Sequence, residues 1–275
     1  MSGTIRVGIA GWVYEPWRGS FYPPGLTQKH ELAHASARLG VIEINATFYA
    51  NQKRTSFANW AGQTPSRFMF TVKGPQLITH RTKLKNPDDP LANFFASGLF
   101  ELGAKLGPIV WQLPPNLSFD PERIETFLQA LPHTPRNAAA LAARQDRIAD
   151  PSLDASAVPA LRHAIEARHA SYQNPAFAAL LSRYNVAMVI PDTVDWPDRR
   201  LTADFVYARL QGPARADATG YGEADLDEWS EQIAAWARDG RDVFAFFVHE
   251  NKLDAPANAM ALMARLGLHG PGQDA

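Results

Sequence analysis

Cysteine is absent from this chain of 275 residues. Disulfide bonds, thiolate nucleophiles and zinc sites built on cysteine are therefore excluded. A strong net charge is also absent, because 27 Lys and Arg stand against 28 Asp and Glu and leave a formal charge of −1. The surface as a whole thus gives no electrostatic reason to bind a polyanion. No strand pattern is followed by a glycine-rich phosphate loop, which weakens the case for a nucleotide-binding fold.

Long apolar runs are missing as well. No segment approaches the length needed to cross a bilayer, and residues 1–4 lead straight into a strand pattern without a signal peptide. We therefore expect a cytoplasmic protein that does not bind membranes. Its content of 46% hydrophobic and 20% charged residues is typical of a globular protein. The length allows one large α/β barrel or two small domains.

The most informative stretch present is VIEINATFY, residues 41–49. Its first half alternates as a strand does, so that Glu43 and Asn45 share one face with Val41, and Ile42 and Ile44 share the other. In a half-exposed antiparallel strand the polar face would meet water. In a parallel strand covered by helices, Glu43 would be buried and would need a partner, with Arg209 or Lys73 as candidates.

Eight strand patterns alternate with helical ones along the chain, and no linker or repeat interrupts them. This alternation predicts a parallel sheet, and eight units in this length favour a single-domain (β/α)8 TIM-type barrel. An alanine-rich extra helix over 137–148 lengthens the connection between strands four and five, and the connection after strand six is poor in helix. We expect one domain over residues 1–267 and a flexible tail over 268–275. The predicted strands are 5–11, 41–45, 68–73, 109–113, 163–168, 186–190, 204–210 and 243–248, and one long helix is expected over 91–105.

Polar side chains stand at the ends of these strand patterns, where a barrel gathers its functional residues at one mouth. They are Glu43, Asn45, Lys73, Gln112, Glu166, Arg168, Asp192, Tyr207 and Arg209. Charges in apolar parallel strands are costly unless they are paired. One interpretation is an ionic plug that fills the barrel, and the other, which we favour for the cluster, is a binding or catalytic site.

Two further groups of residues are candidates for the same mouth. His80, His169 and His249 follow strands three, five and eight, and with Glu43, Glu166 and Asp192 they have the chemistry of an oxygen and nitrogen metal site. The nearby Lys and Arg compete for those carboxylates, so we expect neither metal nor cofactor. Trp12, Tyr14, Trp17, Phe21 and Tyr22 form an aromatic loop that suits either a stacking platform or a hydrophobic plug.

Six motifs in order give the chain a family resemblance. They are GWVYEPWRGSFYP, EINATFY, TPSRFMFTVK, ITH at 78–80, QLPP and TADFVYARLQG. Together they resemble the YecE-like family, known as domain of unknown function 72, from about Val7 to Ala259. The resemblance implies a (β/α)8 barrel and supplies no reaction. The chain departs from the family pattern at Tyr172, Gln211, Val248 and His249. If the family residues at the last three positions are catalytic in relatives, the resemblance implies an altered or lost activity here.

Three functions remain open at this stage. The first is an enzyme or binder for a small polar anion, phosphorylated or carboxylated, held by Arg168, Arg209 and Lys73. Glu43, Glu166 and Lys73 would then be the catalytic residues by acid–base chemistry. Trp12, Tyr14, Asn45, Tyr49, His80, Gln112, Asp192 and Tyr207 would complete the binding site with the two arginines.

The second function is a nucleic-acid-binding or phosphodiester-cleaving barrel, and the third is a barrel that binds a ligand without catalysis. Nucleic acid is not favoured as a partner, because the broad basic face that it requires is not evident at this net charge. The sequence pattern does not specify an oligomeric state.

Overall fold

The computed structural model describes residues 2–193, 195–196, 198–212, 220–248 and 253–272. The chain divides into two compact units, and each is described by itself. The first unit consists of Met1–Glu43, Gln63–Phe68 and Val189–Ala275, and the second of Ile44–Gly62 and Met69–Met188. Every strand pair with a determined register is parallel, as the alternation of strands and helices predicts.

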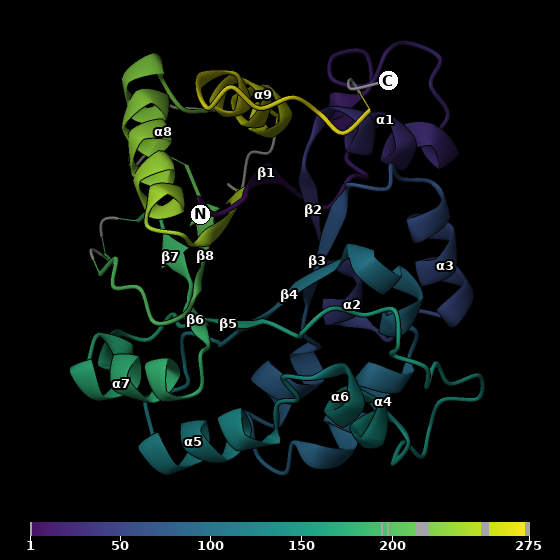
Figure 1. Ribbon diagram of the computed structural model, residues 1–275, viewed down its shortest axis with the longest axis vertical. Coiled ribbons are helices and arrows are strands. Elements are labelled where there is room, and N and C mark those ends of the chain that lie inside the picture. Colours follow the sequence, from purple (N-terminus) through teal and green to yellow (C-terminus); the bar gives the residue numbers. More distant parts are fainter. Residues whose placement is uncertain (1, 194, 197, 213–219, 249–252, 273–275) are drawn as a thin grey trace. The chain divides into compact units, whose positions relative to one another are not determined.

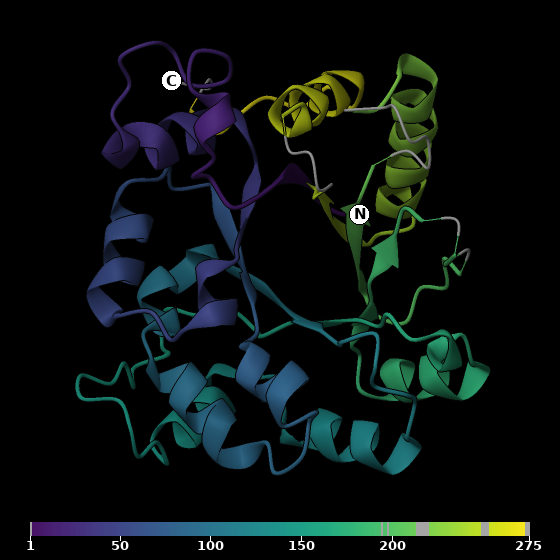
Figure 2. The same cartoon turned by 180° about the vertical axis from the view of Figure 1, so that it is seen from behind.

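The strands of the first unit follow one another in the order β2-β1-β9-β8-β7. Helices α8 and α9 lie side by side against them, as the front and back views both show (Figures 1 and 2). The elements are β1 (Ile5–Ala10), η1 (Glu15–Trp17), η2 (Gln28–His30), α1 (Glu31–Arg38), β2 (Val41–Ile44), β7 (Ile190–Pro191), β8 (Phe205–Leu210), α8 (Glu223–Arg238), β9 (Asp242–Phe247) and α9 (Ala255–Arg265).

Strand register decides which side chains of the first unit share a face. Ala10 pairs with Glu43, and Arg209 pairs with Phe246, which in turn lies opposite Gly8. Glu43 and Arg209 are therefore on the same face, because directly opposed residues of parallel neighbours point to the same side. The opposite face carries Phe247, whose ring contacts Tyr221 just before α8. Glu43 thus points away from the helix-covered side.

The strands of the second unit follow in the order β3-β4-β5-β6. Helices α4 and α6 lie side by side in both views (Figures 1 and 2). The elements are α2 (Ala46–Tyr49), α3 (Arg54–Gly62), β3 (Met69–Lys73), the π-helical turn η3 (Leu77–Arg81), α4 (Asp88–Ala96), η4 (Leu99–Lys105), β4 (Leu106–Gln112), α5 (Pro121–Ala130), α6 (Pro135–Ala142), β5 (His163–Glu166), η5 (Ala170–Tyr172), α7 (Pro175–Arg183) and β6 (Ala187–Met188).

Trp111 marks the helix-packed face of this second sheet. Its ring contacts Phe94 of α4 and Phe127 of α5 at centroid distances of 5.6 and 5.2 Å. Gln112, the next residue of β4, points the other way and lies directly opposite Glu166. Lys73 lies opposite Val110, two residues before Gln112, so Lys73, Gln112 and Glu166 share the face turned away from α4 and α5.

Several predicted boundaries are wrong. The single helix predicted over 91–105 is two helices, because Gly98 has a φ of 136° and separates α4 from η4. Strand four begins at Leu106, before Gly107 and Pro108, and strand six is two short strands on either side of Val189. The extra helix between strands four and five begins and ends earlier than predicted, at Pro135 and Ala142.

The helix-poor connection after strand six agrees with prediction, since the described residues between β7 and β8 contain no helix. No helix in the described ranges is long and apolar enough to cross a bilayer. The predicted single domain over 1–267 and the mobility of the tail stay predictions. At residues 268–272, the N–H of Gly272 donates to the carbonyl of Ala37 in α1.

Candidate functional site

Glu43 is fully enclosed, with no exposed surface, and so is Tyr207 beside it. Its Oε2 accepts a hydrogen bond from the Tyr207 hydroxyl at 2.7 Å, and its Oε1 accepts one from Arg209 Nη2 at 2.9 Å. The predicted burial of Glu43 and its predicted cationic partner are both confirmed, with Arg209 as that partner. The arginine is itself buried, its side chain 6% exposed, so the pair lies out of water.

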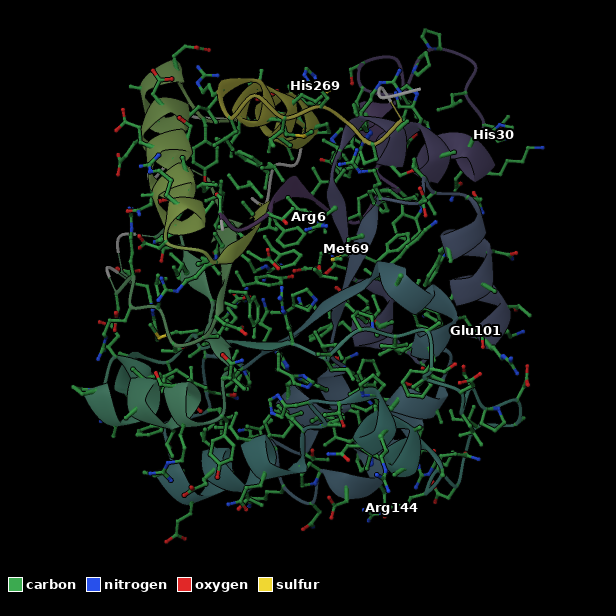
Figure 3. All side chains as sticks on the ribbon, viewed as in Figure 1. Arg6, His30, Met69, Glu101, Arg144 and His269 are labelled. Carbon is green, nitrogen blue, oxygen red and sulfur yellow. The ribbon has the colours of Figure 1, made fainter. Side chains whose placement is uncertain are left out.

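Aromatic packing holds this first cluster in place. The ring of Tyr207 stacks on Phe246 with centroids 4.9 Å apart, which directs its hydroxyl toward Glu43. On the same face, the Arg6 guanidinium lies over the Phe244 ring at 5.9 Å. Figure 3 labels Arg6, whose side chain lies on the side of β1 away from α9. The charges of Glu43 and Arg209 are thus paired with each other beside packed aromatic rings.

Glu166 organises a second cluster at the ends of β4 and β5. Its Oε2 accepts from Gln112 Nε2 at 2.9 Å, and its Oε1 accepts from Arg168 Nε at 3.0 Å. The carboxylate is buried, whereas the Arg168 side chain is 43% exposed. A buried acid thus orients a cation that reaches solvent.

Lys73 and His80 belong to the same unit and meet at one aromatic ring. Lys73 Nζ lies 4.3 Å from the centroid of the Phe48 ring, and the His80 ring contacts Phe48 edge-on at 5.0 Å. The short helix α2 places Phe48, and the Thr47 hydroxyl ties α2 to β3 by donating to the Lys73 carbonyl at 2.7 Å. His80 sits on the π-helical turn, where its Nδ1 is 2.8 Å from the Thr79 hydroxyl.

The electrostatics of His80 connect it to the Glu166 cluster. Burial lowers the pKa of His80 below its ordinary value, and the positive charges of Lys73 and Arg168 lower this pKa further, against a smaller opposing effect of Glu166. His80 is therefore neutral at pH 7, beside two cations and one carboxylate.

Asp192 lies in the first unit within a network that the sequence did not predict. Its Oδ2 accepts from the Trp229 indole N–H at 3.2 Å, and the Tyr221 hydroxyl accepts from the Gly212 N–H at 2.8 Å. Burial raises the pKa of Asp192, while hydrogen bonds from Tyr221 and Trp229 oppose the rise. Tyr221 and Trp229 stand beside and inside a helix, far along the chain from Asp192, so no strand-end pattern marks them.

The remaining predicted residues belong to the aromatic loop and to VIEINATFY. Tyr14 packs edge-on against Trp17 at 5.2 Å, and the Trp12 carbonyl accepts from the Tyr22 hydroxyl. Trp17 and Tyr22 are buried, as a hydrophobic plug requires.

Asn45 is half-buried, and its Oδ1 has no hydrogen-bond partner within the described residues. Tyr49 is 72% exposed and borders a cavity of about 460 Å³.

The four departures from the family pattern fall in different environments. Tyr172 is buried between Phe119 and Phe177, which makes it a packing position. Val248 donates its N–H to the Leu210 carbonyl, and Gln211 is partly exposed. His249 lies outside the described residues. Among those that are described, no group of three or more His, Asp or Glu side chains is arranged to hold a metal ion.

The roles predicted for these residues, and the prediction that Glu43, Glu166 and Arg209 face one common mouth, stay predictions. The structure establishes the neighbours of each residue within its own unit. Glu43 is joined to Tyr207 and Arg209, and Glu166 to Gln112 and Arg168.

Parallel strands alternating with helices, with polar side chains at the strand ends, define an α/β protein of the (β/α)8 TIM-barrel class. The family model described as "Protein of unknown function DUF72" matches residues 6–274, so the chain belongs to the DUF72 family. The predicted fold class and family are thereby confirmed.

The curated relatives agree with this family, and the solved structures agree with this fold. The chain is 29% identical to the UPF0759 protein YunF of Bacillus subtilis over 40% of each chain. It is 30% identical to the UPF0759 protein YecE of Escherichia coli over 46% of this chain and 44% of YecE. The chain thus spans less than half the length of these curated relatives.

Among solved structures, the DUF72 protein of Thermotoga maritima has a TM-score of 0.76 at 24% identity, covering 96% of this chain and 99% of that one. A D-psicose 3-epimerase of Clostridium cellulolyticum has a TM-score of 0.51 at 13% identity, covering 97% and 98%. At these identities the likeness shows the fold alone.

Proposed function

We propose that the second unit binds a small polar substrate through a phosphate or carboxylate group and acts on it by proton transfer. Arg168 carries the proposal. Its Nε is bound to buried Glu166, whereas neither terminal nitrogen forms a hydrogen bond to any residue that the structure describes. A guanidinium whose Nε is held in this way presents its two terminal nitrogens as parallel donors. This geometry suits a carboxylate or phosphate.

The charges around Arg168 support an anion at this place. Lys73 and Arg168 contribute two positive charges, and Glu166 contributes one negative charge. A bound anion would add negative charge beside these two cations. Lys73, Gln112 and Glu166 also share one face at the carboxyl ends of adjacent strands, where proteins of this class place their sites.

In this proposal His80 transfers the proton. It is neutral at pH 7 because burial and the two nearby cations lower its pKa, so its imidazole can accept a proton from a bound substrate. The contact of its Nδ1 with the Thr79 hydroxyl orients the ring. Glu166 positions Arg168, and Lys73 stabilises negative charge that develops on the substrate.

Thermal unfolding at low ionic strength tests the proposal. At about a hundredfold excess over its Kd, phosphate or sulfate should add roughly 2.7 kcal/mol of stability. For a chain of this size, that should raise the melting temperature by about 2–4 °C. Arg168→Gln should abolish the rise, and added chloride should weaken it because screening acts on the same contacts.

Arg54 supplies a matched control. It is 44% exposed, and its Nε contacts Glu101 at 2.6 Å, as the Nε of Arg168 contacts Glu166. Its Nη1 lies 3.6 Å from Asp150, however, and it lies on α3 and not at a strand end. Arg54→Gln should keep the full anion-induced rise. If the melting temperature stays flat in phosphate and sulfate, or if Arg54→Gln removes the rise as completely as Arg168→Gln, the anionic-substrate proposal is wrong.

A further inference from the structure

A cavity of about 460 Å³ lies within the second unit, between α2, the π-helical turn and the start of α4. Its size is that of pockets that enclose small-molecule ligands. None of Lys73, His80, Glu166 and Arg168 borders it, so it is separate from the proposed anion site. Phe48 lies between the two places, because it borders the cavity and also contacts Lys73 and His80.

The rim of the cavity exposes apolar surface. Tyr49 is 72% exposed and Leu77 is 43% exposed, and they belong to the small set of large hydrophobic side chains that are exposed in the described residues. Both border this cavity, together with Ile78 and Pro90. A ring or chain of a ligand that covered them would remove this apolar surface from water.

The same rim carries arginine side chains that form few contacts with carboxylates of the chain. The Arg81 side chain forms no hydrogen bond or ion pair in the described part of the chain. Arg147 has a 78% exposed side chain, and its contact with Asp146 is 3.7 Å long, beyond hydrogen-bond distance. Asp89 is the one carboxylate that borders the cavity, so the lining keeps one net positive charge.

The backbone around the cavity is unusual on one side. Leu77, Ile78 and Arg81 belong to a π-helical turn, a rare form that is frequent at functional sites. Directly after it, Lys83, Leu84 and Asn86 have φ values of 51°, 66° and 47°, the left-handed region that non-glycine residues seldom adopt. Strained conformations of this kind cluster at ligand-binding segments.

We infer that this cavity binds a planar aromatic ligand that carries one anionic group. The ring lies against Tyr49 and Leu77, and the anionic group lies between Arg81 and Arg147. Two kinds of compound share this chemistry, nucleoside monophosphates and aromatic carboxylates.

Isothermal titration with paired probes tests the inference and distinguishes the two sources. The probes are AMP with its neutral counterpart adenosine, benzoate with benzamide, and inorganic phosphate. AMP or benzoate should bind at least about tenfold more tightly than its neutral counterpart, which lacks the charge-assisted contact, and than phosphate, which lacks the ring. Tighter binding of AMP assigns the site to nucleotides, and tighter binding of benzoate assigns it to aromatic acids.

Variants locate the binding. Arg81→Gln and Arg147→Gln should each weaken it about tenfold, and Tyr49→Ser by about three- to tenfold. Arg144 is an exposed arginine near Arg147 that does not border the cavity, and Figure 3 shows it at the outer edge of the unit. Arg144→Gln should leave binding unchanged.

Arg168→Gln separates this inference from the proposed anion site, and it should also leave binding at the cavity unchanged. The inference is overturned if neither AMP nor benzoate binds, or if the Arg81, Arg147 and Tyr49 variants bind as the parent does. It is equally overturned if Arg168→Gln alone abolishes binding.

Discussion

At the scale of single residues, the two buried carboxylates differ in what their partners leave exposed. Glu43 is fully enclosed, and its partner Arg209 is nearly so. Glu166 is also buried, but its partner Arg168 reaches solvent. The first pair therefore fits the ionic plug considered from the sequence, whereas the second keeps donors available for a ligand.

Replacement of Glu43 by Gln should show how much the Glu43–Arg209 pair contributes to the free energy of unfolding. The amide keeps the shape but removes the charge that compensates buried Arg209, so unfolding should become easier by about 2–4 kcal/mol. Denaturant unfolding measures the loss. Glu125→Gln is the control, because Glu125 pairs with a 65% exposed Arg183 and should cost under about 1 kcal/mol. Equal losses of unfolding free energy in the two variants would show that burial does not increase the contribution of the Glu43–Arg209 pair.

His163 should make stability depend on pH. Its Nδ1 accepts from the Trp111 indole N–H at 3.2 Å, so its Nε2 must donate to the Pro132 carbonyl at 2.8 Å, and the ring is neutral. Burial lowers its pKa to about 3. Below pH 6.5 the unfolded chain takes up a proton that native His163 does not, so stability is present above pH 6.5 and is lost as the pH falls toward 3.

Between pH 7 and pH 5 this linkage should remove about 2 kcal/mol of unfolding free energy. In His163→Asn the free energy should fall correspondingly less over the same interval, since the titrating group is gone. His269→Asn changes an exposed histidine and should keep the parental slope. Urea unfolding at pH 7, 6 and 5 measures the slopes, and indistinguishable slopes for the parent and His163→Asn would refute this role.

At the scale of elements, local signals predicted helix starts better than helix ends. Asp120, Thr134 and Asn174 are residue types that favour helix starts ahead of a proline, and their side chains cap α5, α6 and α7. The end of α6 depends on distant residues. The side chain of Asn93 accepts hydrogen bonds from the backbone N–H groups of Asp146 and Arg147, which draws the predicted last turn out of the helix.

Gly98 is where the predicted helix over 91–105 breaks, and it should not tolerate a side chain. A Cβ there would lie 2.7 Å from Arg54 Cα and 2.7 Å from the Phe57 ring, at a φ of 136°. Gly98→Ala should therefore destabilise the protein by about 1–3 kcal/mol in thermal or denaturant unfolding. Gly62→Ala, at the end of α3 with open space around it, should be neutral or slightly stabilising. An unchanged stability of Gly98→Ala would mean that the break between α4 and η4 does not require glycine.

At the scale of the whole molecule, the fold class follows from the sequence because strand and helix patterns alternate along nearly the whole chain. The candidate site can be predicted from the sequence only in part. Polar strand ends mark Glu43, Arg209, Glu166 and Arg168, since charges in apolar strands stand out. Phe48 beneath Lys73, and Tyr221 and Trp229 around Asp192, look like ordinary hydrophobic residues, and their positions depend on tertiary packing that no local pattern encodes.

The central claim is that Arg168 receives an anion on its two terminal nitrogens. Anomalous scattering from selenate in a crystal of the protein tests it directly, because selenium marks the position of the anion. The account predicts an anomalous peak with selenate oxygens about 2.7–2.9 Å from both terminal nitrogens of Arg168, and no such peak in Arg168→Gln. Selenate bound elsewhere on the second unit, with none at Arg168, would contradict the account.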